Sequence, residues 1–327
     1  MRSPQSTEGL MQHLINDCNI RISGDYQKKQ LISYGYYHGY KGYRFFRNHN
    51  IQIPYADFAE VVAVIEYDSN LKSALYSDLM FVETALKNIV CNKAVEGLSA
   101  AAFDSVYAER MSDHPENSAL QAKRLKLRNA VYSTISRRYS AEAHMENQMI
   151  RHFYNRGEDA PLWVIFEVLY MSDLADFFSC LNESVREEIL QYLEMLDISI
   201  DTGRTLLSSM IYTLKALRNA VAHNSVIFDA RFRDRNISTV LRKWTERETG
   251  INNITLYALI DYLILLCCLL KRLDFSDTRA ESLLQRYKEQ NQKLQSSVSP
   301  AVYETIARGY TAQKIRGLET YLASESR

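Results

Sequence analysis

Residues 55–95, "YADFAEVVAVIEYDSNLKSALYSDLMFVETALKNIVCNKAV", decide the fold class of this 327-residue chain. Apolar side chains recur through the stretch at intervals of three and four residues. Such spacing gathers them on one face of an α-helix. The stretch therefore predicts a long helix with a buried face, formed by Val61, Val64, Ile65, Leu71, Leu75, Leu79, Val82 and Leu86.

The rest of the chain also favours helices. Only 11 glycines and 5 prolines are present, and this scarcity of turn residues argues against a many-stranded β fold. We expect an all-α protein of at least eight helices, with an irregular connection over 96–118 and a turn-rich aromatic segment over 34–48. Beyond 55–95, helical patterns cover 6–20, 123–140, 160–181, 184–196, 201–224, 252–275, 279–295 and 301–324.

Composition narrows the functional classes. The 39 basic and 39 acidic residues balance, so any nucleic-acid contact must be a local patch. The five cysteines are odd in number and form no CxxC pair, which fits a reducing cytoplasm. The most apolar run, 254–270, is short and contains Asp261, which predicts a buried helix and no membrane partner. No cluster of carboxylates or histidines suggests a metal, and we expect no cofactor.

Polar residues interrupt the apolar helix 201–224 near its end. Arg218, Asn219, His223 and Asn224 stand there among leucines and a valine, where a buried charge needs a partner or a purpose. On an ideal helix the side chains of Arg218 and His223 point about 140° apart. A site that uses both requires a bend in the helix or a second copy of the motif, which makes a homodimer the expected arrangement.

Several further residues are candidates for binding. Glu83 lies on the apolar face of 55–95 and needs a partner, either Lys87 or a group from elsewhere in the fold. The tyrosine-rich segment 34–48 either stacks on bases beside Arg44 and Arg47 or closes the helical core. Two basic runs either hold RNA or form solvated surface; they contain Lys123, Arg124, Lys126, Arg128, Arg137 and Arg138, and Arg231, Arg233 and Arg235.

"LRNAVAHN", residues 217–224, resembles the R-N-x-x-x-H signature of the HEPN ribonuclease superfamily. Over residues 10–275 the chain is similar to the Abi-like (AbiD/AbiF-type) abortive infection proteins. The likeness also rests on "LISYGYYHGYKGYRFF", on 66–90 and on "PLWVIFEVLYMSDLADFF". It departs at Lys87, where the family often has arginine, and at Met171-Ser172, where Phe-Gly is usual.

The resemblance implies a HEPN-like helical bundle over residues 1–275, including the N-terminal segment 1–54, with a C-terminal helical extension over 276–327. It also implies a toxin-like, metal-independent endoribonuclease that leaves 2′,3′-cyclic phosphate and 5′-hydroxyl ends. His223 would act as general acid–base, Arg218 would hold the phosphate, and Asn219, Asn224 and Glu83 would orient these groups. The expected partners are substrate RNA and a structured non-coding RNA.

Two other interpretations of the same residues remain open at this point. One is a HEPN-type module that binds RNA or a protein without catalysis, because folds are often kept without their chemistry. The other is a helical scaffold in which Arg218 and His223 cap and pin helices.

Overall fold

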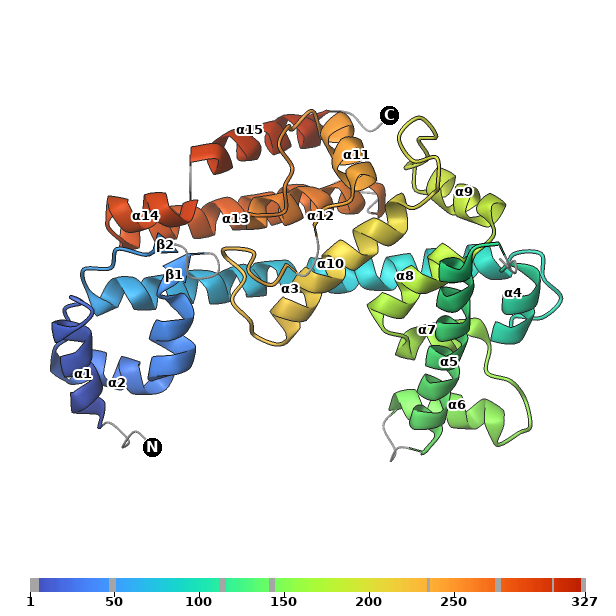
Figure 1. Ribbon diagram of the computed structural model, residues 1–327, viewed down its shortest axis with the longest axis horizontal. Helices are drawn as coiled ribbons and strands as arrows, with labels where there is room; N and C mark the ends of the chain where they lie inside the picture. The colour runs from blue at the N-terminus through green and yellow to red at the C-terminus, as the bar shows by residue number, and fades with distance from the viewer. Residues whose placement is uncertain are drawn as a thin grey trace. The chain divides into compact units, whose positions relative to one another are not determined.

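The computed structural model describes residues 6–46, 51–111, 116–140, 145–233, 236–273, 278–307 and 309–324. These residues form fifteen α-helices, one π-helix and a single antiparallel pair of two-residue strands (Figure 1). The predicted all-α class is therefore confirmed. The chain folds into two compact units: unit 1 contains Met1–Asp78, Ala216–Asn236 and Thr249–Arg327, and unit 2 contains Leu79–Lys215 and Ile237–Glu248.

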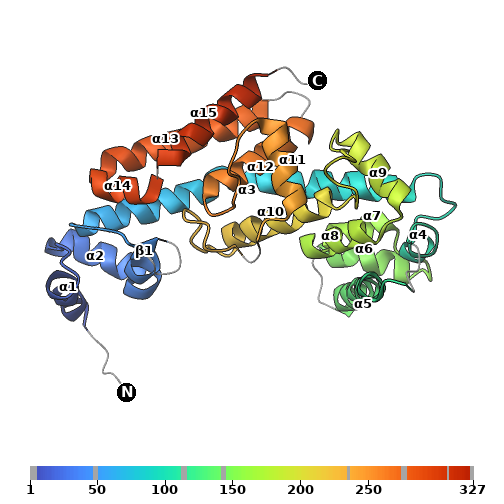
Figure 2. The same ribbon diagram turned by 45° about the horizontal axis from the view of Figure 1, so that its top comes forward.

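Unit 1 is built around a helix that is buried on all sides. Every residue of α12 from Leu259 to Leu270 is buried, and both α13 and α15 pack against this helix (Figures 1 and 2). The elements of unit 1 are α1 (Thr7–Asn16), α2 (Gly24–Tyr34), the π-helix η1 (Gly35–Lys41), β1 (Phe45–Phe46), β2 (Ile51–Gln52), the first half of α3 (Phe58–Val95), the end of α10 (Leu206–Ala222), α12 (Leu259–Leu273), α13 (Thr278–Ser297), α14 (Pro300–Ala307) and α15 (Gly309–Ala323).

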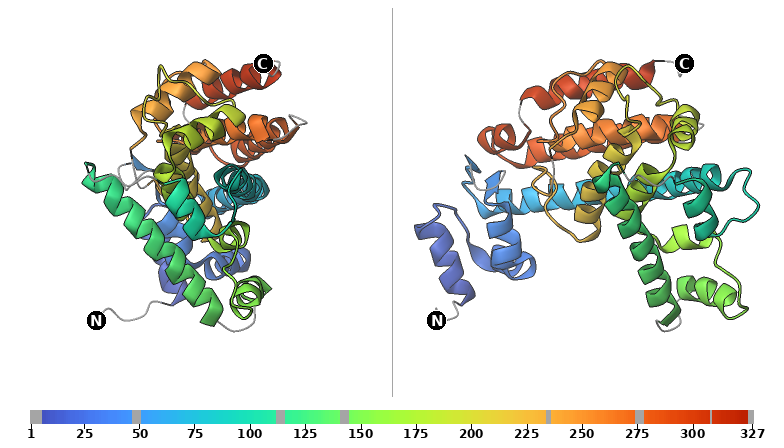
Figure 3. Two further views of the ribbon diagram at one scale, coloured as in Figure 1. Left: turned by 90° about the vertical axis from the view of Figure 1, so that its right-hand side faces the viewer. Right: turned by 45° about the vertical axis from the view of Figure 1, so that its right-hand side comes forward.

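Unit 2 is organised around α5, the long green helix in Figure 3, which packs against α6, α7 and α8. The side chain of Asp201 stabilises the start of α10, which lies in this unit. Its carboxylate accepts hydrogen bonds from the amides of Thr205 and Leu206 at 2.8 and 2.7 Å. Unit 2 contains the second half of α3, α4 (Phe103–Glu109), α5 (Ser118–Ser140), α6 (Met145–Tyr154), α7 (Leu162–Val168), α8 (Met171–Cys180), α9 (Glu183–Tyr192), the start of α10, and α11 (Thr239–Thr249), whose last residue belongs to unit 1.

The periodicity of residues 55–95 is confirmed by the 38-residue helix α3, in which every residue of the predicted apolar face is buried. The apolar run 254–270 is confirmed as part of a buried helix, although α12 begins only at Leu259. Within the described ranges, no helix combines the length and the apolar character that a membrane crossing requires. The apolar residues that predicted both helices are part of the protein core.

Three predictions of local structure were wrong, two of them in unit 2. Residues 160–181 form two helices, because Leu169 and Tyr170 adopt extended backbone between α7 and α8. The break lets Phe166 and Phe177 meet edge to face, with ring centroids 4.9 Å apart. The supposed irregular connection 96–118 contains α4, a short helix that forms because Phe103, Val106 and Tyr107 are buried.

The tyrosine-rich segment is helical rather than turn-rich, since Gly35–Lys41 forms η1. Tyr40, Tyr43 and Phe46 are buried, as expected if the segment closes the core. The guanidinium carbon of Arg44 lies 5.0 Å from the ring centroid of Phe45. Arg47 lies outside the described residues.

Candidate functional site

The polar motif lies at the C-terminal end of α10. The helix is regular up to Ala222, and the amide of His223 still donates to Asn219 O at 2.9 Å. Asn224 then turns the chain with a φ of 53°, while the amide of Ser225 donates to Ala220 O at 2.8 Å. This is the hydrogen-bond pattern of a Schellman cap, whose left-handed position asparagine tolerates well.

Because α10 is uninterrupted to Ala222 and the amide of His223 keeps its helical hydrogen bond, Arg218 and His223 stay on different faces of one helix. Arg218 is half-buried and has contacts within the chain. His223 is exposed, and its ring makes no hydrogen bond to any described residue. Asn219 lies one helical turn before His223 and is half-buried. A site that uses both Arg218 and His223 was expected to need a bend in the helix or a second copy of the motif. The helix is not interrupted between these two residues, so the first arrangement is not observed.

A buried carboxylate in α3 fixes the turn that follows His223. Asp68, whose side chain is fully buried, accepts hydrogen bonds through Oδ1 from the amides of Ile227 and Phe228 at 2.8 and 2.7 Å. Its Oδ2 accepts from the hydroxyl of Tyr43 at 2.9 Å and lies 2.9 Å from Nζ of Lys72. Four donors thus surround one carboxylate, as a buried charge requires.

Lys72 extends this network to the motif itself. Its Nζ donates to Oδ1 of Asn224 at 2.6 Å, so the side chain next to His223 is held from α3. Burial and the neighbouring Asp68 carboxylate raise the pKa of the Tyr43 hydroxyl, which keeps it a hydrogen-bond donor. We name Asp68, Lys72, Tyr43 and Asn224 the turn anchor; its effect is to present His223 on a rigid turn.

Sequence reasoning did not single out Asp68, Lys72 or Tyr43. Two signals were available: Asp68 and Lys72 lie in the stretch 66–90 that carries the family resemblance, and they are an acid and a lysine four residues apart on the predicted helix. For Glu83 the structure shows the expected local partner, since its Oε1 lies 3.1 Å from Nζ of Lys87 within unit 2.

Of the six basic residues that the sequence singled out in α5, three are buried or half-buried and three are exposed. Arg124 is buried: its guanidinium carbon lies 3.8 Å from the ring centroid of Tyr107, and it donates to Tyr107 O at 3.1 Å. Lys123 lies 3.7 Å from the carboxylate of Asp176, and Arg138 is half-buried with contacts of its own. The exposed set consists of Lys126, Arg128 and Arg137.

Exposed aromatic rings accompany this second set. The guanidinium of Arg128 lies 6.0 Å from the ring centroid of Tyr132, and that of Arg137 lies 5.3 Å from the ring centroid of Tyr170. Both tyrosines are exposed. Proteins bind single-stranded RNA with cations that contact its phosphates and with accessible aromatic rings that stack on its bases.

The second basic run has structural partners in unit 1. Arg231 pairs with Asp229 at 2.7 Å and donates to the carbonyl oxygens of Gly42 and Phe45 at 2.6 and 2.7 Å. Arg233 lies over the ring of Tyr257, 3.6 Å from its centroid. Arg235 lies outside the described residues. Arg231 therefore fastens the loop after the motif to the tyrosine-rich segment.

In the part of the chain that the structure describes, no three His, Cys, Asp or Glu side chains are grouped so as to hold a metal ion. The comparisons with known proteins found one family. The model of that family, described as Abi-like protein, matches residues 29–229, which is more than half of the chain and includes both α3 and the polar motif. Neither the curated proteins nor the solved structures contain a match.

Proposed function

Because the chain belongs to the Abi-like protein family, we propose that it is an abortive infection protein that defends bacteria against phage by cleaving RNA. The proposed activity is a metal-independent endoribonuclease of HEPN type, with Arg218 and His223 as the reacting side chains. The observation that supports it is the exposed imidazole of His223 on a turn that the turn anchor holds in place.

The chemistry requires a base and a charge stabiliser at one phosphodiester. The imidazole of His223 accepts the proton of the RNA 2′-hydroxyl, and the 2′-oxygen attacks phosphorus. The guanidinium of Arg218 stabilises the charge on the phosphate oxygens. The bond from phosphorus to the 5′-oxygen breaks, and this oxygen takes a proton, leaving a 2′,3′-cyclic phosphate and a 5′-hydroxyl.

In the proposed dimer, one protomer supplies Arg218 and the other supplies His223, because the two side chains lie on different faces of α10. A two-fold axis beside the end of α10 would create two such composite sites per dimer. Asn219 and Asn224 then have different roles. Asn224 orients the turn through Lys72, whereas Asn219, on the same helix face as His223, is placed to contact the phosphate or the imidazole.

The exposed cations and rings of α5, together with the ring of Tyr170 just before α8, are the proposed RNA contact, formed by Lys126, Arg128, Arg137, Tyr132 and Tyr170. This face suits a single strand of substrate RNA or the loops of a structured non-coding RNA. Its affinity should fall steeply with salt, because phosphate contacts release counterions.

The first experiment measures cleavage of total bacterial RNA by purified protein, with mapping of the new ends. His223→Ala and Arg218→Ala should each lower the rate by at least about a hundredfold, the usual contribution of such groups. His38→Ala is the matched control, since His38 is also exposed and lies in the same unit. Cleavage that survives both motif substitutions would refute catalysis by this pair, whereas a parent protein that binds RNA without cleaving it would favour the RNA-binding module.

The second experiment tests the composite site by mixing the two inactive variants. A mixed dimer of Arg218→Ala and His223→Ala retains one site with both groups. Activity should recover to roughly a quarter of the parental value, because random pairing places half of the chains in mixed dimers with one intact site of two. If mixing restores nothing while light scattering shows mixed dimers, the composite arrangement is wrong.

A further inference from the structure

A second group of reactive side chains lies at the end of α1, in unit 1. Nδ1 of His13 lies 2.5 Å from the carboxylate of Asp17, and Nε2 of the same ring lies 3.7 Å from Sγ of Cys18. When Nδ1 carries the proton toward Asp17, Nε2 presents its lone pair to the thiol. A nucleophile, a base and a group that orients the base are thus in sequence, as in thiol-activating triads.

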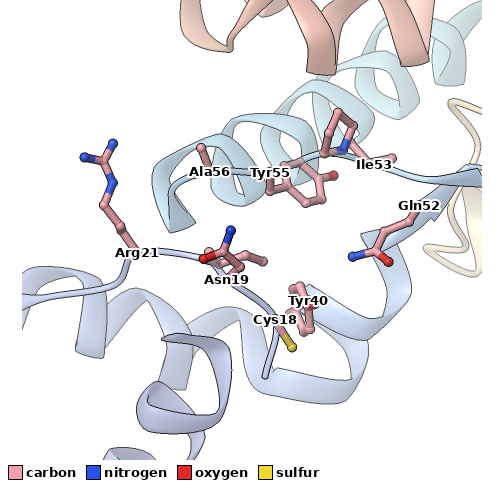
Figure 4. A pocket seen from close by; sticks show the side chains of 10 residues that line it. Cys18, Asn19, Arg21, Tyr40, Gln52, Ile53, Tyr55 and Ala56 are labelled. Atoms are coloured by element: carbon pink, nitrogen blue, oxygen red, sulfur yellow. The ribbon is translucent and has the colours of Figure 1, made fainter. Parts of the chain in front are cut away.

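Cys18 also lines a pocket of about 520 Å³ (Figure 4). This size lies within the range of small-molecule sites. Asn19 and Gln52 contribute polar amide side chains to the lining. Arg21 also belongs to the lining, but its guanidinium points away from the other side chains (Figure 4), is largely exposed and lies 3.7 Å from the carboxylate of Asp57. The pocket therefore suits a polar ligand.

Tyr40 supplies an independent sign of a ligand. It lines the same pocket and is only 1% exposed, and among the described residues its hydroxyl has no partner other than the Cys18 thiol, which is a weak hydrogen-bond acceptor. A buried hydroxyl with so weak a partner is costly, and a bound polar molecule would reduce that cost. Burial, followed by the hydrogen bond to Cys18, raises the pKa of this hydroxyl, so it remains a donor at neutral pH.

The other cysteines provide an internal contrast. Cys91, Cys180, Cys267 and Cys268 are all buried. Burial raises the pKa of Cys91 to about 12 and that of Cys180 to about 11, which disfavours the reactive thiolate. Cys18 is half-buried and opens to a pocket, so it combines access with a neighbouring base.

We propose that Cys18, with His13 as its base and Asp17 as the group that orients the imidazole, is a modification site that forms a mixed disulfide with a low-molecular-weight disulfide bound in this pocket. The thiol proton passes to Nε2 of His13, and the thiolate attacks one sulfur of the ligand. A bond from Cys18 to that sulfur forms, the ligand's own sulfur–sulfur bond breaks, and the departing thiolate takes the proton from the imidazolium. Cys18 is oxidised and the departing sulfur is reduced.

The test treats the full-length protein with oxidised glutathione and follows the mass of the intact chain with time. Cys18→Ser should abolish the mixed disulfide, and His13→Ala should slow its formation by at least about tenfold. His38→Ala is the matched control and should react like the parent. Added imidazole should partly restore the rate of His13→Ala, which a purely structural role of His13 would not allow.

A second arm tests the pocket. Tyr40→Phe should slow the reaction with oxidised glutathione by about fivefold, the worth of one hydrogen bond. The same variant should react at the parental rate with hydroxyethyl disulfide, a small neutral probe. Equal rates for His13→Ala and the parent would overturn the proposal, as would modification of a different cysteine. Catalytic turnover of an activated ester by Cys18 would assign acyl transfer instead. None of these outcomes depends on RNA cleavage.

Discussion

Helix α3 carries two acid–lysine pairs of the same spacing, and the comparison of their surroundings is instructive. In unit 1, the side chains of Asp68 and Lys72 are 0% and 9% exposed, and they bond to residues more than 150 positions away in the sequence. In unit 2, those of Glu83 and Lys87 are 10% and 13% exposed, and their ion pair joins neighbouring turns of one helix. The same local pattern therefore fixes a distant turn in one case and links adjacent helix turns in the other.

The physical difference lies in the backbone groups that depend on Asp68. Asp68 satisfies two backbone amides, a tyrosine hydroxyl and an ammonium group. Removing its charge leaves those donors in a dry interior, and this costs more than the attraction within the pair. The ion pair of Glu83 with Lys87 is nearly as buried, and it lies between two adjacent turns of α3.

The largest expected effect is that of Asp68→Asn. It should lower the free energy of unfolding by about 3–5 kcal/mol, because Lys72 would remain charged and buried without its counter-ion. Urea unfolding gives this value, and hydrogen exchange should show faster opening at the amides of Ile227 and Phe228. A loss below about 1 kcal/mol would mean that the turn anchor does not hold the turn.

Substitution of Asn224 gives an intermediate effect and separates its two roles. Asn224→Ala should cost about 1–2 kcal/mol more than Asn224→Gly, because glycine adopts the left-handed conformation without strain. Both variants lose the bond to Lys72. Equal stabilities of the two variants, measured by thermal unfolding, would contradict the capping role.

The smallest expected effect is that of Glu83→Gln, at about 1 kcal/mol, because glutamine keeps an oxygen that can accept a hydrogen bond from Lys87. Cleavage should keep its parental rate if the ion pair with Lys87 is the main role of Glu83. Folded Glu83→Gln protein with RNA cleavage reduced tenfold would instead support the orienting role that the resemblance implied. This measurement most directly sharpens the contrast between the two pairs.

Periodicity predicted the longest helix, α3, because a repeating apolar face is a local property of the chain. The buried helix α12 was predicted from its continuous apolar run, which is also a local property. The extended residues Leu169 and Tyr170 were not predicted, since the gain from the break is a contact between Phe166 and Phe177. The runs of arginine did not distinguish Arg124, stacked on Tyr107, from the exposed Arg128 and Arg137.

For the candidate site, the sequence predicted which residues could react, but it did not predict which other residues hold them in place. Arg218 and His223 stood out because charged and titratable groups are rare on an apolar helix. The angle between their side chains around the helix axis was predicted from the helical pitch alone, and α10 is a continuous helix up to Ala222. Asp68 and Lys72 lie in the stretch 66–90 that carries the family resemblance, but their role in the turn anchor was not predicted, because their partners in 224–228 are far away in the sequence.

By itself, the sequence determined the all-α class, the long apolar face of α3 and the angular separation of Arg218 and His223, since each depends on the geometry of neighbouring residues in one helix. The tertiary structure decided which ion pair is buried, which arginines are available to a ligand, and how the turn after His223 is held. Those outcomes depend on hydrogen-bond donors brought to one carboxylate from distant parts of the chain, and no local pattern records them.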